Sequence, residues 1–260
     1  MQNLDIIISF LPPAILILLL VVGYFRGRGR NERIMNRTVE KLREDMSDVI
    51  EDLTLVSGNP TGRTYTIKLA KPRRIEDAEE NNDSIASLLK SVQRARIYLS
   101  MEERQMLFSW MLLLFRKAKD FLVIEADPLP QRNEYLKAEV IEWKSVAKHQ
   151  LDKFKSEFVN YQEVESQSEF GSKFFHKSNY PNALRHLYQN DPLIRKLIYN
   201  LPGLHRLSVK SKEDYTLRVV CLLGKDSDLK MLKSLVLRYL RALSETNQVI
   251  IKQPKRFLMS

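Results

Sequence analysis

Five carboxylates within eight residues form the densest group of side chains that could do chemistry: Glu76, Asp77, Glu79, Glu80 and Asp83. Carboxylate oxygens bind Ca²⁺, but an EF-hand loop needs ligands at fixed positions and a glycine at its sharp turn. This segment has neither the spacing nor the glycine. We therefore predict that the polar stretch from Lys71 to Ser84 is a solvated loop and not a metal site.

Histidine and cysteine are too scattered to predict a metal site or a nucleophile. The single cysteine, Cys221, excludes an intramolecular disulfide and a cysteine-cluster zinc site, and its setting VVCLL is typical of a small core residue. The histidines share no ligand spacing, and each is expected to be a surface or structural residue: His149, His176, His186 and His205.

Sequence motifs for catalysis are absent as well. The chain has no phosphate loop, no Rossmann glycine pattern, no nucleophile elbow and no H-E-x-x-H motif. The pair Glu102-Glu103 is expected at a helix N-terminus, where carboxylates interact favourably with the helix dipole. We therefore expect a protein that is not an enzyme, with no catalytic residue, no cofactor and no metal.

The element that dominates the chain is Ile6–Phe25, twenty residues without a charge. At about 1.5 Å per helical residue it crosses a hydrocarbon core of about 30 Å. We predict a transmembrane anchor, in preference to a buried core helix or a cleaved signal peptide, because a signal peptide carries its positive charges before the apolar run. Prolines interrupt helices, so the helix proper is expected to begin near Pro12, with Ile6–Leu11 as an interfacial lead-in. The anchor residues are Ile6, Phe10, Pro12, Pro13, Leu16, Leu20 and Phe25.

Positive charge follows this segment directly and none precedes it. Arg26, Arg28, Arg30 and Arg33 crowd one flank, so the positive-inside rule places the N-terminus outside or in a lumen and the rest of the chain in the cytosol. The whole chain has 42 Lys+Arg against 32 Asp+Glu, a net charge of +10. Beside a membrane, such an excess favours anionic lipid heads, RNA phosphates or acidic partners.

The cytosolic part is predicted to begin with a basic amphipathic helix over Asn31–Asp52, followed by a hairpin of LTLVSG and RTYTIKLAK around Asn59-Pro60-Thr61-Gly62. Residues Ser84–Lys119 are expected to be helical with a break near Ser100. Within them the apolar run Met106–Phe115 is either a buried helix or a surface for a membrane partner. The exposed residues of such a surface would be Phe108, Trp110 and Met111.

The later segments suggest an α+β fold built from two α-β-β-α units. The first unit would contain helix 101–118, the strands FLVIEA and YLKAEVIEW, and helix 143–159. The second would contain helix 191–199, the strands LHRLSVK and YTLRVVCLL, and helix 226–243. The expected divisions are an anchor at 1–25, a basic helix at 26–53, the two units at 54–160 and 161–245, and a short basic tail at 246–260.

Three stretches in this order resemble the calumin family, coiled-coil-domain-containing membrane proteins of the PAT complex at the Sec translocon. They are the single span with a basic amphipathic helix that ends in EDLTLVSG, LSMEERQMLFSWMLLLFRKAKDFLVIEADP, and LHRLSVKSKEDYTLRVVCLLGKDSDLKMLKSLVLRYLRAL. The resemblance covers most of residues 6–245 in order and approximate spacing. It implies a non-enzymatic chaperone subunit that assists insertion and folding of multipass membrane proteins. The implied partners are the ribosome, the Sec translocon, a small multi-span protein like asterix, and client transmembrane segments.

The chain departs from the family at both ends. Only Met1–Asp5 precede the apolar run, so the family's acidic calcium-binding segment has no counterpart, and NQVIIKQPKRFLMS stands where the family has a long coiled-coil tail. A reduced homologue of this kind suggests an archaeal plasma membrane, or the endoplasmic reticulum if the source is eukaryotic. The rival hypothesis is a generic anchored scaffold that binds anionic lipid or a protein partner. The residues expected to contact the ribosome or anionic lipid are Arg26, Arg28, Arg30, Arg33, Arg37, Lys252, Lys255 and Arg256.

Overall fold

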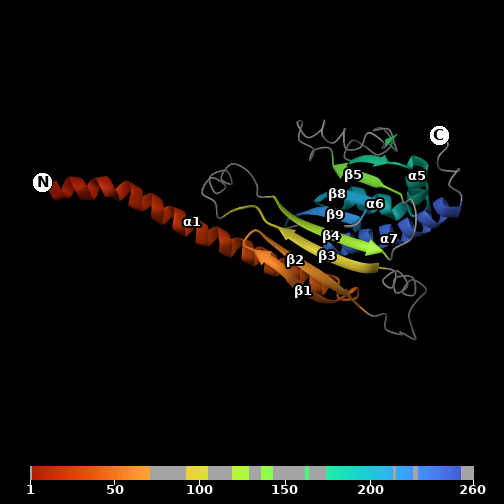
Figure 1. Ribbon diagram of the computed structural model, residues 1–260, viewed down its shortest axis with the longest axis horizontal. Coiled ribbons are helices and arrows are strands. Elements are labelled where there is room, and N and C mark those ends of the chain that lie inside the picture. The colour runs from red at the N-terminus through yellow and green to blue at the C-terminus, as the bar shows by residue number, and fades with distance from the viewer. Residues whose placement is uncertain are drawn as a thin grey trace.

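The computed structural model has an α+β fold, in which a long N-terminal helix leads to an antiparallel sheet that is covered by C-terminal helices (Figure 1). It describes residues 2–70, 92–104, 119–128, 136–142, 162–163, 174–212, 215–224 and 228–252. The helices among them are α1 (Gln2–Asp45), α5 (Pro181–Asn190), α6 (Pro192–Asn200) and α7 (Leu229–Lys252).

Within the described residues, nine strands form one sheet in the order β1-β2-β3-β4-β9-β8-β5-β7-β6, and each pairs with its neighbours in antiparallel fashion. The strands are β1 (Ile50–Asn59), β2 (Gly62–Leu69), β3 (Val92–Ser100), β4 (Asp120–Pro128), β5 (Ala138–Glu142), β6 (Gln162–Glu163), β7 (Phe174–Ser178), β8 (Leu204–Lys212) and β9 (Tyr215–Leu223).

Helix α1 is continuous over 44 residues, about 66 Å, and includes Pro12 and Pro13 in its interior. The expectation that the helix starts near Pro12 is therefore wrong, and Ile6–Leu11 is helical. Each proline removes one intrahelical hydrogen bond, and the uninterrupted residues on both sides of Pro12 and Pro13 continue the helix despite that loss.

The predicted basic helix over Asn31–Asp52 is the second half of α1, but it ends earlier than expected. At Met46 the chain turns, and the Val49 and Ile50 amides donate to the Met46 carbonyl oxygen. Ile50–Asp52 then belong to β1. The hairpin of β1 and β2 is confirmed, and the Asn59 side chain accepts hydrogen bonds from the backbone and hydroxyl of Thr61 in its turn.

Strand β3 contradicts the prediction that this stretch is helical. Ala95, Ile97 and Leu99 are buried, and the residues between them face the other side of the sheet. This alternation with period two defines a strand. The remaining residues of the predicted helix, 84–91 and 105–118, lie outside the described residues, as do the polar stretch 71–84 and the predicted helix 143–159.

The hairpin predicted within the first α-β-β-α unit, between FLVIEA and YLKAEVIEW, does not form, although both of its strands exist as β4 and β5. β4 pairs with β3 and β9, whereas β5 pairs with β8 and β7. The hairpin of β8 and β9, which is confirmed, lies between β4 and β5 in the sheet. Strands from both predicted units therefore share one sheet, because the strongly apolar β9 takes the central place and pairs along both of its edges.

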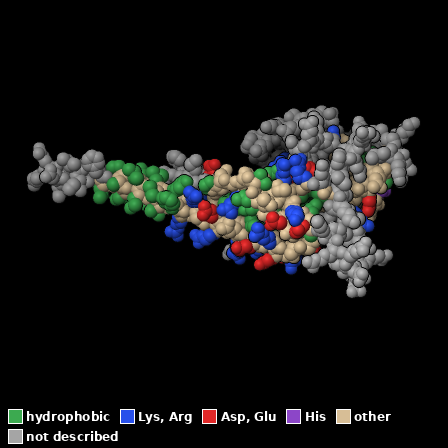
Figure 2. Space-filling view, turned by 60° about the horizontal axis from the view of Figure 1, so that its bottom comes forward, with side chains coloured by type: hydrophobic (Ala, Val, Ile, Leu, Met, Phe, Trp, Pro, Cys, Tyr) green, Lys and Arg blue, Asp and Glu red, His purple; other side chains and the backbone are tan. Residues whose placement is uncertain are grey.

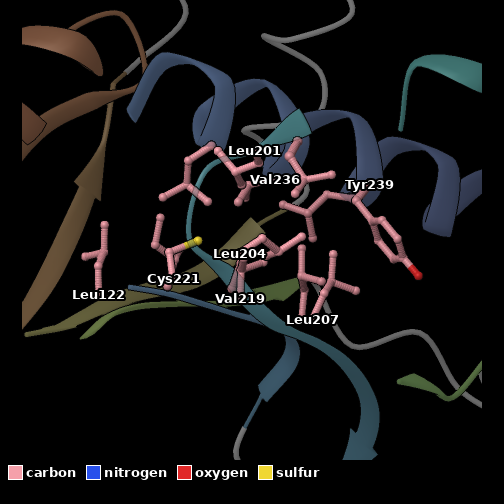
Figure 3. Packing of buried hydrophobic residues seen from close by; sticks show 14 of the residues in the cluster. Leu122, Leu201, Leu204, Leu207, Val219, Cys221, Val236 and Tyr239 are labelled. Carbon is pink, nitrogen blue, oxygen red and sulfur yellow. The ribbon is translucent and has the colours of Figure 1, made fainter. Parts of the chain in front are cut away.

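The helices near the C-terminus cover the sheet. α6 and α7 match two predicted helices, and α7 extends into the predicted tail as far as Lys252. Figure 3 shows Val236 and Tyr239 of α7 above Val219 and Cys221 of β9. Cys221 is buried, which confirms its prediction as a core residue. The elements α5, β6 and β7 were not expected from the sequence.

Candidate functional site

The apolar half of α1 projects away from the sheet and is exposed (Figure 1). Phe25 at its end is 64% exposed, whereas among the described residues after it only Leu55, Val56 and Leu193 are exposed large hydrophobic side chains. By length and composition α1 can cross a membrane, although a signal sequence near an N-terminus passes the same test. Of the predicted anchor residues, Pro12, Pro13, Leu16, Leu20 and Phe25 are exposed, and Ile6 and Phe10 lie in α1 before the first described side chain.

Directly after this segment, α1 acquires two different faces. One face is buried against the domain and recurs every three or four residues, through Asn31, Met35, Thr38, Leu42 and Met46. It packs against β1 and α7. The domain thus covers one side of the helix and leaves the other to solvent.

The exposed face holds four arginines at steps of four, three and four residues: Arg26, Arg30, Arg33 and Arg37. At 3.6 residues per turn they lie roughly 140° around the helix from the buried stripe. Figure 2 shows Lys and Arg side chains directly beside the green apolar part of α1. We call these four residues the arginine face.

The arginine face borders an open hollow of about 340 Å³, which Ile34 also lines. Among the described residues, no carboxylate forms an ion pair with any of its four guanidinium groups. Arg28, predicted as part of the same collar, differs because its Nε lies 3.2 Å from Glu32 Oε1. The hydrogen bond to Glu32 raises the pKa of Arg28. The structure therefore separates Arg28 from the four arginines whose charge is available to an anion.

A buried polar cluster fixes the domain to α1 close to the arginine face. The Asn31 amide donates to the carbonyl oxygens of Pro60 and Glu102, both over 3.1 Å. Arg104 donates from Nη1 to Asn31 Oδ1 and from Nη2 to Asp120 Oδ2, each over 2.6 Å. All three side chains are less than a tenth exposed. The cluster therefore joins the helix, the β1–β2 turn, the residues just after β3 and the first residue of β4.

This cluster fixes the position of the domain along α1. Asn31 lies six residues after Phe25, which is about 9 Å along the helix. Two ion pairs strengthen the far end of the same junction, where Lys233 and Lys230 of α7 approach Asp48 and Asp45 over 2.9 and 3.8 Å. The sequence offered one signal for the cluster, since Asn31 occupies a position in the buried stripe of α1. Nothing local marked Arg104 or Asp120.

The residues considered for catalysis have structural roles where the structure describes them. His176 is buried, its Nδ1 lies 2.9 Å from the Tyr188 hydroxyl, and burial lowers its pKa to about 3. Burial raises the pKa of Cys221 to about 12, so its thiol is neutral. Glu102 is not helical, contrary to expectation, and its Oε2 accepts a hydrogen bond from the Lys119 backbone.

The other sequence-predicted sites can be placed only in part. His186 contacts Asn190, and the His205 ring lies against Phe121. Lys252 is the last residue of α7. Several predicted sites lie outside the described residues: the acidic cluster 76–83, His149, Lys255, Arg256, and the partner surface of Phe108, Trp110 and Met111.

Comparison with known proteins does not assign the chain to a family. No protein-family model and no curated protein matches the chain. The exposed apolar helix, the arginine face and the buried cluster at Asn31 are therefore the observations from which function is argued.

Proposed function

We propose that the protein is a non-enzymatic, single-pass membrane protein that assists the insertion and folding of multipass membrane proteins. In this proposal α1 crosses the membrane, its N-terminus lies outside or in a lumen, and the sheet domain lies in the cytosol. The membrane is that of the endoplasmic reticulum in a eukaryote and the plasma membrane in an archaeon. The resemblance to the calumin family supplies the proposed partners, namely the ribosome, the Sec translocon, a small asterix-like protein and client transmembrane segments.

One observation carries this proposal: α1 is a single helix that begins in the apolar segment and ends inside the domain. A jointed linker would let the domain turn freely below the membrane. Here the buried cluster at Asn31 and the ion pairs to α7 hold the domain at one position along α1 and at one rotation about it. A subunit that aligns a cytosolic machine with a membrane channel needs such a fixed geometry.

The part of α1 furthest from the apolar segment presents basic side chains that suit contact with ribosomal RNA. Arg33, Arg37 and Lys41 lie about 12, 18 and 24 Å beyond Phe25 along α1. The headgroup layer of one leaflet is about 5–8 Å thick, so these residues lie below it. All three are exposed, and guanidinium and ammonium groups that neutralise RNA phosphates give an affinity that depends strongly on salt.

Ribosome cosedimentation tests the proposal. Membranes carrying the full-length protein are solubilised gently and the ribosomes are pelleted at low and at high salt. We expect the protein to pellet at low salt only, and R33E/R37E to remain in the supernatant. The matched control, R185E/K196E, makes the same charge change on α5 and α6 and is expected to pellet normally. If R33E/R37E pellets like the wild type, this surface does not bind the ribosome.

A further inference from the structure

The upper part of the arginine face lies at a different depth from the part assigned to RNA. Arg26 and Arg30 follow Phe25 by one and five residues, about 1.5 and 7.5 Å along α1. If Phe25 marks the end of the hydrocarbon, both residues lie within the headgroup layer of about 5–8 Å. Lipid phosphates occupy that layer.

The direction of the side chains strengthens this placement. In an α-helix each Cα–Cβ bond tilts toward the helix N-terminus. The N-terminal half of α1 is the apolar half, so the side chains of Arg30 and Arg33 lean back toward the membrane. Long basic side chains extend further in this direction when they place their charge at an interface.

The hollow beside these arginines has the positive charge and the open access that an anion-binding site needs. Its volume of about 340 Å³ is open to solvent, and four arginine residues line it. Among the described residues, no carboxylate forms an ion pair with these arginines, so none competes with a ligand for them. A guanidinium group binds phosphate oxygens through two parallel hydrogen bonds, and Ile34 adds one apolar wall.

We infer that this hollow binds the phosphate of an anionic phospholipid in the cytoplasmic leaflet, with Arg26 and Arg30 as the ligands. The inference rests on the proposed membrane anchor and is independent of ribosome binding.

Arg28 provides a matched control at the same depth. It lies between Arg26 and Arg30 in the chain, about 4.5 Å beyond Phe25, but it pairs with Glu32. A diffuse attraction between positive charge and an anionic surface would depend on Arg28 as much as on its neighbours. A site in the hollow depends on Arg26 and Arg30 and not on Arg28.

Native mass spectrometry of the full-length protein tests the inference. The wild type, R26Q, R30Q and R28Q are each released from membranes of equal phosphatidylglycerol and phosphatidylcholine content, and the ratio of the two lipids retained is measured. We expect the wild type to retain phosphatidylglycerol preferentially. The ratio should fall about fivefold in R26Q and in R30Q, and remain unchanged in R28Q. Millimolar inorganic phosphate should not displace the lipid, because the ligand is a headgroup and not free phosphate.

Three results overturn the inference. These are an equal fall in all three variants, no preference in the wild type, and displacement of the lipid by inorganic phosphate. Alkaline extraction of the same membranes reports on the anchor itself. Release of the wild type by alkali contradicts the proposed function, whereas a retained protein with no lipid preference contradicts only the lipid site.

Discussion

The guanidinium group of Arg104 donates a 2.6 Å hydrogen bond to the side-chain oxygen of Asn31, 73 residues earlier in the chain. The same guanidinium forms a 2.6 Å ion pair with Asp120, and both side chains of this pair are at least nine-tenths buried. The link between α1 and the sheet is thus a buried charge pair bonded to an amide, and it lies about 9 Å along the helix from the end of the apolar segment.

Removing Arg104 should destabilise the domain strongly. R104M leaves Asp120 buried without its cation, and breaking a buried pair in this way costs about 3–5 kcal/mol. N31A should cost less, because it leaves the buried ion pair of Arg104 and Asp120 in place. Chemical denaturation of the full-length protein in detergent measures both. In the double variant the two effects should not add, since the residues share one hydrogen bond; strict additivity would show that the contact is not energetically coupled.

The core between the sheet and α7 should be sensitive to truncation. Leu235 of α7 is fully buried, so L235A should lower the free energy of unfolding by about 2–5 kcal/mol. Leu193 of α6 is 44% exposed, and L193A should change the free energy of unfolding by about 0.5 kcal/mol or less. Thermal denaturation of the two variants side by side makes the comparison. Equal losses would mean that α7 does not pack as described.

Cys221 should resist thiol reagents until the protein unfolds. Its thiol is buried, and burial raises its pKa to about 12, so little reactive thiolate exists at pH 8. Because it is the only cysteine in the chain, total labelling by iodoacetamide reports on this site alone. We expect negligible labelling of the native protein and complete labelling in denaturant. Rapid labelling of the native protein would place Cys221 at a surface.

Acid should destabilise the fold through His176. Burial lowers its pKa from 6.5 to about 3, so below pH 6.5 the unfolded chain binds a proton that the folded protein does not. The stability from this residue is fully present above pH 6.5 and is lost at about 1.4 kcal/mol per pH unit as the pH falls toward 3. Denaturation at pH 7.5 and 5.5 should show this loss in the wild type and in H186Q, and a smaller loss in H176Q. An equal loss in H176Q would assign it to other groups.

Local patterns in the sequence were enough to predict several elements of the fold. The charge-free run Ile6–Phe25, the turn residues Asn59–Gly62 and the amphipathic repeat of α7 each carry their own signal, and all three elements are present. β3 was predicted to be part of a helix over Ser84–Lys119, and the sequence directly next to it carries no cluster of turn residues that would mark a strand. Ala95, Ile97 and Leu99 in the same nine residues alternate as a strand does, and the sheet selects this pattern.

Pairing between distant strands and the candidate site were harder to predict. The sequence of β4 and β5 does not reveal that β9 and β8 lie between them. The spacing of Arg26, Arg30, Arg33 and Arg37 was visible, but only the structure separates them from Arg28, which pairs with Glu32. The contacts among Asn31, Arg104 and Asp120 depend on the finished fold, because the three residues belong to segments far apart in the chain.

The most direct test of the account is affinity purification of the full-length protein from gently solubilised membranes, followed by mass spectrometry with and without ribonuclease and high salt. The account predicts recovery of the Sec channel together with ribosomal proteins, and loss of the ribosomal proteins after either treatment. Recovery of neither would contradict a role in membrane-protein biogenesis.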